Sequence, residues 1–355
     1  MINCPNFDKV AAKFDEYWHR ENHDRPLMVV RAPAEKCKTV PEFIGTKKER
    51  WLDTEYMLKT TRIGLENTLQ FGEAFPTSFP NLGPDIFGAF LGCDLEFEET
   101  TSYATGLADD LNDLDLTRFH YDGFWWKKIV EMTEAMLDEA KGDYIVGITD
   151  LHPGMDALVS LRGPENLCFD LYEEPELVEK LTLQAFDRFK EVYTGLHDII
   201  SRKQKGETNW MNIYHPEGWY VTSCDFMGMI SEPMMERFVL PELKMELDML
   251  GHSVFHLDGV GALRHLDRLL ELPNLDGIQW VYGAGQPTAA HWIEVIRKIQ
   301  AAGKMVHIEI TADDLPVLLE NVAPEGILYT TYCRNAEEAM RLIRMAENAR
   351  PKKIF

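Results

Sequence analysis

The sequence predicts an α/β fold, a single (β/α)8 TIM barrel, from a strand–helix pattern that repeats in its C-terminal half. Four short apolar runs start at positions 253, 277, 304 and 326, so successive starts lie 24, 27 and 22 residues apart. An amphipathic helical pattern follows each run. A strand followed by a helix at this spacing is typical of the parallel βα units from which such barrels are built.

The N-terminal half shows the same pattern less clearly. A helical pattern, DKVAAKFDEYW, comes first, and further helical stretches separate the apolar runs that follow. These runs supply four more candidate strands, at 26–33, 77–83, 143–151 and 209–218. Because the total is then eight, we expect one domain over 1–355, with a helical extension at 1–25 and an excursion over the barrel mouth at 94–140.

Composition excludes several classes of protein. The chain has 36 Lys+Arg against 59 Asp+Glu, a formal net charge of -23, which argues against nucleic-acid binding and against docking on anionic lipid. No apolar run approaches the roughly 18 residues of a membrane span, and the N-terminus lacks a signal peptide's apolar region. Six cysteines without a CxxC pair indicate free thiols in a reducing compartment. We therefore expect a cytoplasmic enzyme.

Ionisable residues recur at the predicted strand ends. The carboxyl ends of barrel strands carry the active site, and residues i and i+2 of a strand point the same way. Four candidate strands end in two ionisable residues at that spacing, and a cysteine follows the eighth strand. The pairs are Asp150 and His152, His215 and Glu217, His256 and Asp258, and His307 and Glu309. We expect these side chains to meet at the barrel mouth.

A divalent metal is one explanation for this convergence. His256, Asp258 and Cys333 offer the nitrogen, oxygen and sulfur ligands that zinc takes, and a catalytic zinc site uses three protein ligands and one open position. The alternative is that the same groups only hydrogen-bond one another and the loops. The catalytic candidates are His215, Glu217, Asp225 and Glu309. The substrate-binding candidates are Asp150, His152, Trp219, Gln279, Trp280 and Tyr332.

A second interpretation uses carboxylates alone. Glu217 and Glu309, facing each other across the mouth, would resemble the carboxylate pair of a glycosidase. Neighbouring aromatic residues could then be sugar platforms, could stack on a flat cofactor, or could simply fill the core. These aromatic residues are Trp219, Tyr220, Trp280 and Tyr282.

Three segments resemble the uroporphyrinogen decarboxylase superfamily. LVSLRGPENLCFDLYEEPELVEKL at 158–181 looks like that superfamily's segment after the third strand, and DFMGMISEPMMERFVLPELK at 225–244 looks like its segment after the fourth. FHLDG at 255–259 falls where relatives read H-x-C-G or H-x-D-G. The resemblance runs from about residue 143 to the C-terminus. It implies a TIM barrel, as the strand pattern does, and a homo-oligomer, since relatives often dimerise.

The superfamily has two main chemistries. Its porphyrinogen decarboxylases carry an arginine-rich N-terminal signature that binds propionates, of which only Arg31 is present here. Its cobalamin-dependent methyltransferases hold zinc with H-x-C and a later cysteine; His256 and Cys333 match, and Asp258 replaces the middle cysteine. An aspartate keeps the ligand charge but makes zinc a stronger Lewis acid. The resemblance therefore implies a methyltransferase-like enzyme that takes methylcobalamin from a separate corrinoid protein.

Two competing hypotheses stay open. A decarboxylase or lyase without metal would bind a substrate carboxylate through Arg31, Arg162 or His215. Activity that chelators leave untouched would favour it. A binding or scaffold protein that has lost catalysis would have its mouth filled by tryptophans. The residues concerned are Trp210, Trp219 and Trp280.

Overall fold

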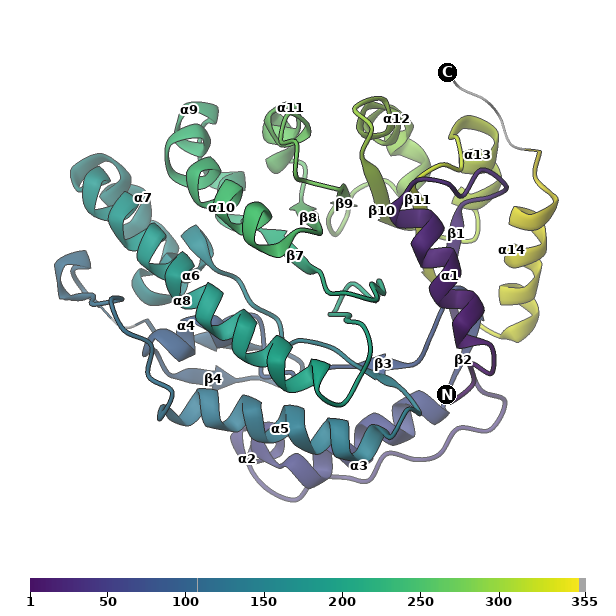
Figure 1. Cartoon of the computed structure of the whole chain (residues 1–355), viewed down its shortest axis with the longest axis horizontal. Coiled ribbons are helices and arrows are strands. Elements are labelled where there is room, and N and C mark those ends of the chain that lie inside the picture. The colour runs from purple at the N-terminus through teal and green to yellow at the C-terminus, as the bar shows by residue number, and fades with distance from the viewer. Residues whose placement is uncertain (107, 351–355) are drawn as a thin grey trace.

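The computed structural model describes residues 1–106 and 108–350 of the chain, which form a seven-stranded sheet and two smaller ones (Figure 1). The main sheet has the order β2-β1-β11-β10-β9-β8-β7, β3 pairs with β6, and β4 pairs with β5. The strands are β1 (Leu27–Pro33), β2 (Thr68–Gly72), β3 (Thr77–Ser78), β4 (Leu95–Phe97), β5 (Ser102–Ala104), β6 (Ile145–Val146), β7 (Tyr220–Ser223), β8 (Ser253–Asp258), β9 (Gly277–Val281), β10 (Met305–Glu309) and β11 (Ile327–Tyr332).

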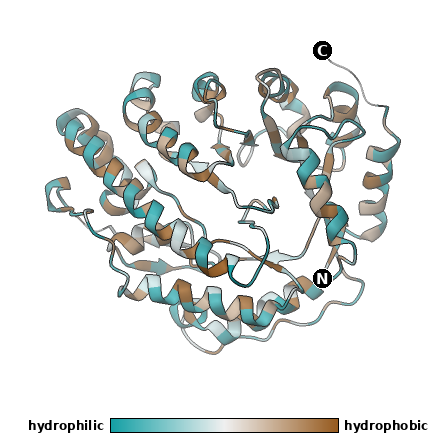
Figure 2. Ribbon diagram, viewed as in Figure 1, coloured by the Kyte–Doolittle hydropathy of each residue, from teal (hydrophilic) through white to brown (hydrophobic). Residues whose placement is uncertain are grey.

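Helices lie on the outside of the strands, as Figure 1 shows. Their faces alternate between hydrophilic and hydrophobic residues along the ribbon (Figure 2), as expected for helices that cover a sheet. The α-helices are α1 (Phe7–Trp18), α2 (Lys47–Leu52), α3 (Thr54–Glu66), α4 (Ile86–Leu91), α5 (Phe124–Ala140), α6 (Gly154–Arg162), α7 (Pro164–Glu173), α8 (Pro175–Ser201), α9 (Glu232–Met234), α10 (Leu240–Leu250), α11 (Leu266–Leu270), α12 (Ile293–Ala301), α13 (Asp314–Asn321) and α14 (Ala336–Asn348). None of the described helices is both long and apolar enough to cross a membrane.

The predicted α/β class is confirmed, with a sheet that is mostly parallel. Neighbouring strands from β1 through β11, β10, β9 and β8 to β7 run parallel, and only β2 is antiparallel to its neighbour β1. The apolar runs starting near 26, 253, 277, 304 and 326 are strands as predicted. Those at 77–83 and 143–151 each contain a strand of two residues. Strand β2 was not among the predicted strands.

The predicted strand at 209–218 is wrong. The chain turns at Asn212, whose φ of 57° lies in the left-handed region, and then runs back. His215 pairs antiparallel with Glu207, each backbone N–H donating to the other's carbonyl, at 2.8 and 3.1 Å. The parallel strand of this unit is β7, which begins only at Tyr220. His215 and Glu217 therefore precede a strand instead of ending one.

Helix α1 covers the amino-terminal ends of the strands. Its buried residues Val10, Phe14, Tyr17 and Trp18 have the spacing of one helix face. The Tyr17 hydroxyl donates to the carbonyl of Val306, the second residue of β10, at 3.3 Å. The carboxyl-terminal ends of the parallel strands lie at the opposite edge, where the loops leading to the outer helices begin.

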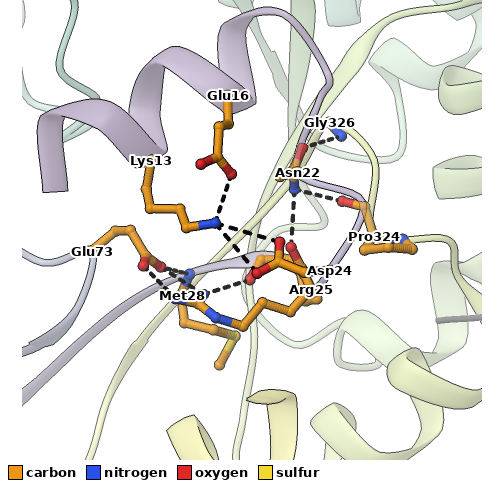
Figure 3. A network of polar contacts seen from close by, with 10 residues as sticks. Lys13, Glu16, Asn22, Asp24, Arg25, Met28, Glu73, Pro324 and Gly326 are labelled. Atoms are coloured by element: carbon orange, nitrogen blue, oxygen red, sulfur yellow. Dashed lines mark hydrogen bonds and ion pairs between the residues drawn. The ribbon is translucent and has the colours of Figure 1, made fainter. Parts of the chain in front are cut away.

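A polar network joins the segment after α1 to the sheet (Figure 3). Arg25 forms a two-fold ion pair with Glu73 at 2.6 and 2.9 Å, and Glu73 also accepts from the backbone N–H of Met28 at 2.8 Å. The buried Asn22 donates to the carbonyl of Pro324 at 2.7 Å and accepts from the N–H of Gly326 at 2.8 Å. The start of β1 is thereby tied to the segment that precedes β11.

The segment 94–140 contains the antiparallel pair β4–β5 and helix α5. Helix α5 contacts α3, α4 and α8, so it belongs to the outer layer of helices.

Candidate metal centre

Three ionisable side chains meet at the carboxyl-terminal ends of β7 and β8. They are Asp225, the first residue of the 3-10 helix η2 (Asp225–Met229), and His256 and Asp258 of β8. Each offers one ligand atom, and these atoms all lie within 4.8 Å of one another. The distance from His256 Nε2 to Asp225 Oδ1 is 3.9 Å. Within 1–106 and 108–350, this is the one group of three or more such residues with that spacing.

Strand register explains why these three residues meet. Ser223 of β7 is the register partner of His256, so Asp225 lies two residues beyond Ser223, as Asp258 lies two beyond His256. Side chains two apart on neighbouring parallel strands point to the same side. The predicted pair His256 and Asp258 therefore lies beside Asp225, which the sequence analysis placed among the catalytic candidates.

Gln279 orients the imidazole of His256. Gln279 is the register partner of His256 on β9, and its Oε1 lies 2.5 Å from His256 Nδ1. An amide oxygen only accepts, so Nδ1 donates to Gln279, and Nε2 is the ring nitrogen that faces the carboxylates. The ring of Trp210 packs edge-on against His256, with ring centroids 5.0 Å apart.

The two carboxylates of the cluster are not neutralised by a basic side chain in the described part of the chain. Neither Asp225 nor Asp258 forms an ion pair with a lysine or arginine in the described part of the chain. Burial, and then the nearby carboxylate of Asp156, raise the pKa of Asp225 above its ordinary value. Asp156 itself holds η2 in place, accepting from the backbone N–H groups of Asp225 and Phe226 at 2.9 and 3.0 Å. Two oxygens and one neutral imidazole nitrogen fit a divalent cation such as zinc.

Asp150 and His152, predicted together, do lie together beside this cluster. His152 Nε2 is 3.0 Å from Asp150 Oδ1, and its Nδ1 is 2.9 Å from the hydroxyl of Ser223. Burial opposes the charged imidazolium, but the carboxylates of Asp150 and Asp156 raise the pKa of His152 well above its ordinary value. The pair provides an ordered acid and base group at the strand ends.

A cavity of about 250 Å³ adjoins the cluster through Gln279. Its lining includes five residues that the sequence singled out, namely Arg31, Gln279, His307, Glu309 and Tyr332. Among the described residues, the Arg31 guanidinium has only neutral acceptors, with Nε donating to Gln70 Oε1 at 3.2 Å and Nη2 to the Phe75 carbonyl at 3.5 Å. Burial lowers the pKa of Arg31 to about 10.

His215 and Glu217 lie away from the cluster, contrary to the predicted catalytic site. The His215 ring packs on that of His252, with centroids 4.3 Å apart, just before β8 begins. Burial, and then His252, lower the pKa of His215 to about 4. Glu217 precedes β7, whereas Glu309 ends β10, so these two carboxylates do not face each other across one mouth as a glycosidase pair would.

Two predicted aromatic platforms belong to the core. Trp219 is fully buried and donates through Nε1 to the carbonyl of Ile213 at 3.2 Å. Trp280 is 1% exposed and packs on Trp292, with centroids 5.3 Å apart. Trp280 is adjacent to Gln279 on β9, so alternation along the strand turns it to the opposite side from the cavity.

Cys333 does not lie in the cluster of Asp225, His256 and Asp258. It is buried one residue after β11, and its backbone N–H donates to the carbonyl of Arg31 at 2.7 Å. Burial, and then the charge of Glu338 on α14, raise the pKa of its thiol. The charged neighbours of this thiol are thus on α14 or in the turn just before it.

Comparison with known proteins supports the fold. No protein-family model matches the chain, and no curated protein matches its sequence. Among solved structures, the chain is similar to a methyltransferase from Methanosarcina mazei, with a TM-score of 0.60 and 11% identity over 96% of this chain and 98% of that chain. Overlap along the whole length at such low identity shows a shared fold. The chain is an α/β protein with a methyltransferase-like fold and a candidate metal centre at the strand ends.

Proposed function

We propose that this chain is a metal-assisted, methyltransferase-like enzyme that acts on a small molecule. The observation that carries the proposal is the convergence of Asp225, His256 and Asp258 at the carboxyl-terminal strand ends, where the active sites of parallel barrels lie. Likeness of fold to a solved methyltransferase supports the reaction class.

The same proposal includes a TIM barrel of the uroporphyrinogen decarboxylase superfamily, formed by one domain with 94–140 as its excursion. The parallel pair β3–β6 could supply the two strands that the main sheet lacks between β1 and β7. Together with β1 and β7–β11 these make eight strands in the expected order along the chain. A homo-oligomer and a cytoplasmic location remain predictions.

Asp225, His256 and Asp258 would hold the metal, with Gln279 fixing the imidazole. Bound zinc would act as a Lewis acid and lower the pKa of the group that accepts the methyl. His152, held by Asp150, and Glu309 are the residues we assign to proton transfer, because they lie at the strand ends. Asp225 has 55% of its side chain exposed, which is compatible with a methylcobalamin that a corrinoid protein presents from outside.

A metal-free decarboxylase or lyase is the second candidate, and Arg31 is the observation that favours it. Of the three carboxylate-binding candidates, Arg162 is paired with Asp170 at 2.7 Å and His215 lies at the amino-terminal edge. Arg31 alone lines the cavity, without an acidic partner among the described residues. An unpaired guanidinium in a cavity is suited to a substrate carboxylate.

The zinc content and the methyl-transfer activity of the purified protein distinguish between the two candidate functions. We expect a zinc content near one atom per chain, and methyl transfer from methylcobalamin to a panel of thiols and alcohols that His256→Ala abolishes. His19→Ala, at an exposed position just after α1, is the matched control and should leave transfer unchanged. Protein that binds no zinc and transfers no methyl group, but releases carbon dioxide from an organic acid in EDTA, would favour the decarboxylase or lyase.

A further inference from the structure

His307 is a buried histidine whose ring nitrogens have no hydrogen-bond partner among residues 1–106 and 108–350. The residue is 3% exposed on β10, and neither Nδ1 nor Nε2 makes a hydrogen bond to any described part of the chain. By contrast, the buried His265 has one ring nitrogen paired, with Nε2 at 2.9 Å from the Met227 carbonyl, and only its Nδ1 lacks a partner in the described part of the chain. Leaving a buried polar group unpaired destabilises a fold, so such a group calls for an explanation.

The position of His307 suggests the explanation. His307 and His256 are both register partners of Gln279, so the three side chains occupy one level across β8, β9 and β10. His307 lines the 250 Å³ cavity together with Arg31, Gln279 and Glu309. The buried His307 ring is therefore part of the cavity wall that Arg31 also lines.

The chemistry of His307 limits what it can bind. Burial, and then the ring of His256, lower the pKa of His307 to about 3, so the ring is neutral under physiological conditions. A neutral imidazole offers one N–H donor and one acceptor nitrogen and no charge. Its natural partner is an uncharged oxygen group, a hydroxyl or a carbonyl, while the charged end of the same molecule would face Arg31.

We propose that His307 is a substrate-binding residue that hydrogen-bonds an uncharged oxygen group of a small organic acid. The carboxylate of that acid would face Arg31, which lines the same cavity. This inference rests on the proposed function only in taking the strand ends as the active site. It requires neither the metal nor methyl transfer, so its failure and theirs can be told apart.

Stability provides the first test. If His307 is kept for binding, His307→Leu removes an unpaired polar group and should raise the melting temperature of the ligand-free protein. His265→Leu is the matched control, because it removes a buried histidine whose Nε2 is hydrogen-bonded and should lower the melting temperature. Destabilisation of His307→Leu as large as that of His265→Leu would show a structural role and overturn the proposal.

A matched pair of probes provides the second test. Lactate and propionate share a carboxylate and a carbon skeleton, and only lactate carries a hydroxyl. Titration followed by NMR should show lactate binding roughly 5- to 10-fold more tightly than propionate, the value of one hydrogen bond, and perturbing the His307 ring nitrogens. In His307→Leu the two acids should bind equally. Equal binding to the wild-type protein, or no binding of lactate, would overturn the proposal, whether the protein is zinc-loaded or EDTA-treated.

Discussion

The Nδ1 atom of His256 lies 2.5 Å from Oε1 of Gln279, a contact between neighbouring parallel strands. It fixes the proton on Nδ1 and presents Nε2 to the carboxylates of Asp225 and Asp258. The tautomer of His256 is thus set by Gln279, which is not itself one of the candidate metal ligands.

Replacing Gln279 should weaken metal binding without unfolding the protein. In Gln279→Ala the His256 ring loses its acceptor, so we expect zinc affinity to fall about 10- to 100-fold, as for other partners of metal-ligating histidines. Competition with a chelating dye measures the affinity. Gln279→Glu retains an acceptor oxygen and should keep most of it. An unchanged affinity in Gln279→Ala would show that the contact does not orient the ligand.

The ion pair between Arg25 and Glu73 should be important for stability. The exposed fractions of the two side chains are 13% and 4%, so Glu73→Gln leaves a largely buried guanidinium without its counter-charge. We expect a loss of about 3 kcal/mol in the free energy of unfolding. Glu294→Gln, which breaks the surface pair with Arg297, should cost less than about 1 kcal/mol. Equal losses in denaturant titrations would contradict this assignment.

Glu242 should make the protein less stable as the pH rises. Glu242 and Glu246 are both buried on α10, and burial, assisted by the charge of Asp156, raises the pKa of Glu242 from 4.5 to about 7. Between these values the folded state binds a proton that the unfolded chain has released. This contribution to stability is therefore present at low pH and is lost as the pH rises through about 7.

Glu242→Gln tests this pH dependence, since the amide cannot ionise. The stability of the variant relative to wild type should increase between about pH 5 and about pH 8. Urea denaturation at the two values measures the difference. A difference that stays constant with pH would mean that Glu242 titrates alike in both states.

The sequence pattern predicted those strands that are followed directly by a helix in the chain. Apolar runs followed by amphipathic helices located β8 to β11, because each such unit is continuous in the chain. The run at 209–218 also has apolar residues followed by a histidine and an acidic residue. However, the chain turns at Asn212, so that His215 pairs antiparallel with Glu207. Pro216 lacks the backbone N–H that a central strand donates to its neighbour, and it is a local sign that this run is not such a strand.

The candidate site was predictable to the same extent. His256 and Asp258 share one strand face, so their spacing alone indicated that they act together. Asp225 joins them only through the register of β7 against β8, which depends on knowing where β7 ends. Had the strand been placed at 220–223, the same spacing rule would have selected Asp225.

X-ray absorption at the zinc edge tests the central claim most directly, because it identifies the ligand atoms. Binding by Asp225, His256 and Asp258 predicts a first shell of nitrogen and oxygen at about 2.0–2.2 Å that is unchanged in Cys333→Ser. A sulfur scatterer at about 2.3 Å that disappears in Cys333→Ser would instead establish the ligand set His256, Asp258 and Cys333. Protein that takes up no zinc would contradict a metal centre altogether.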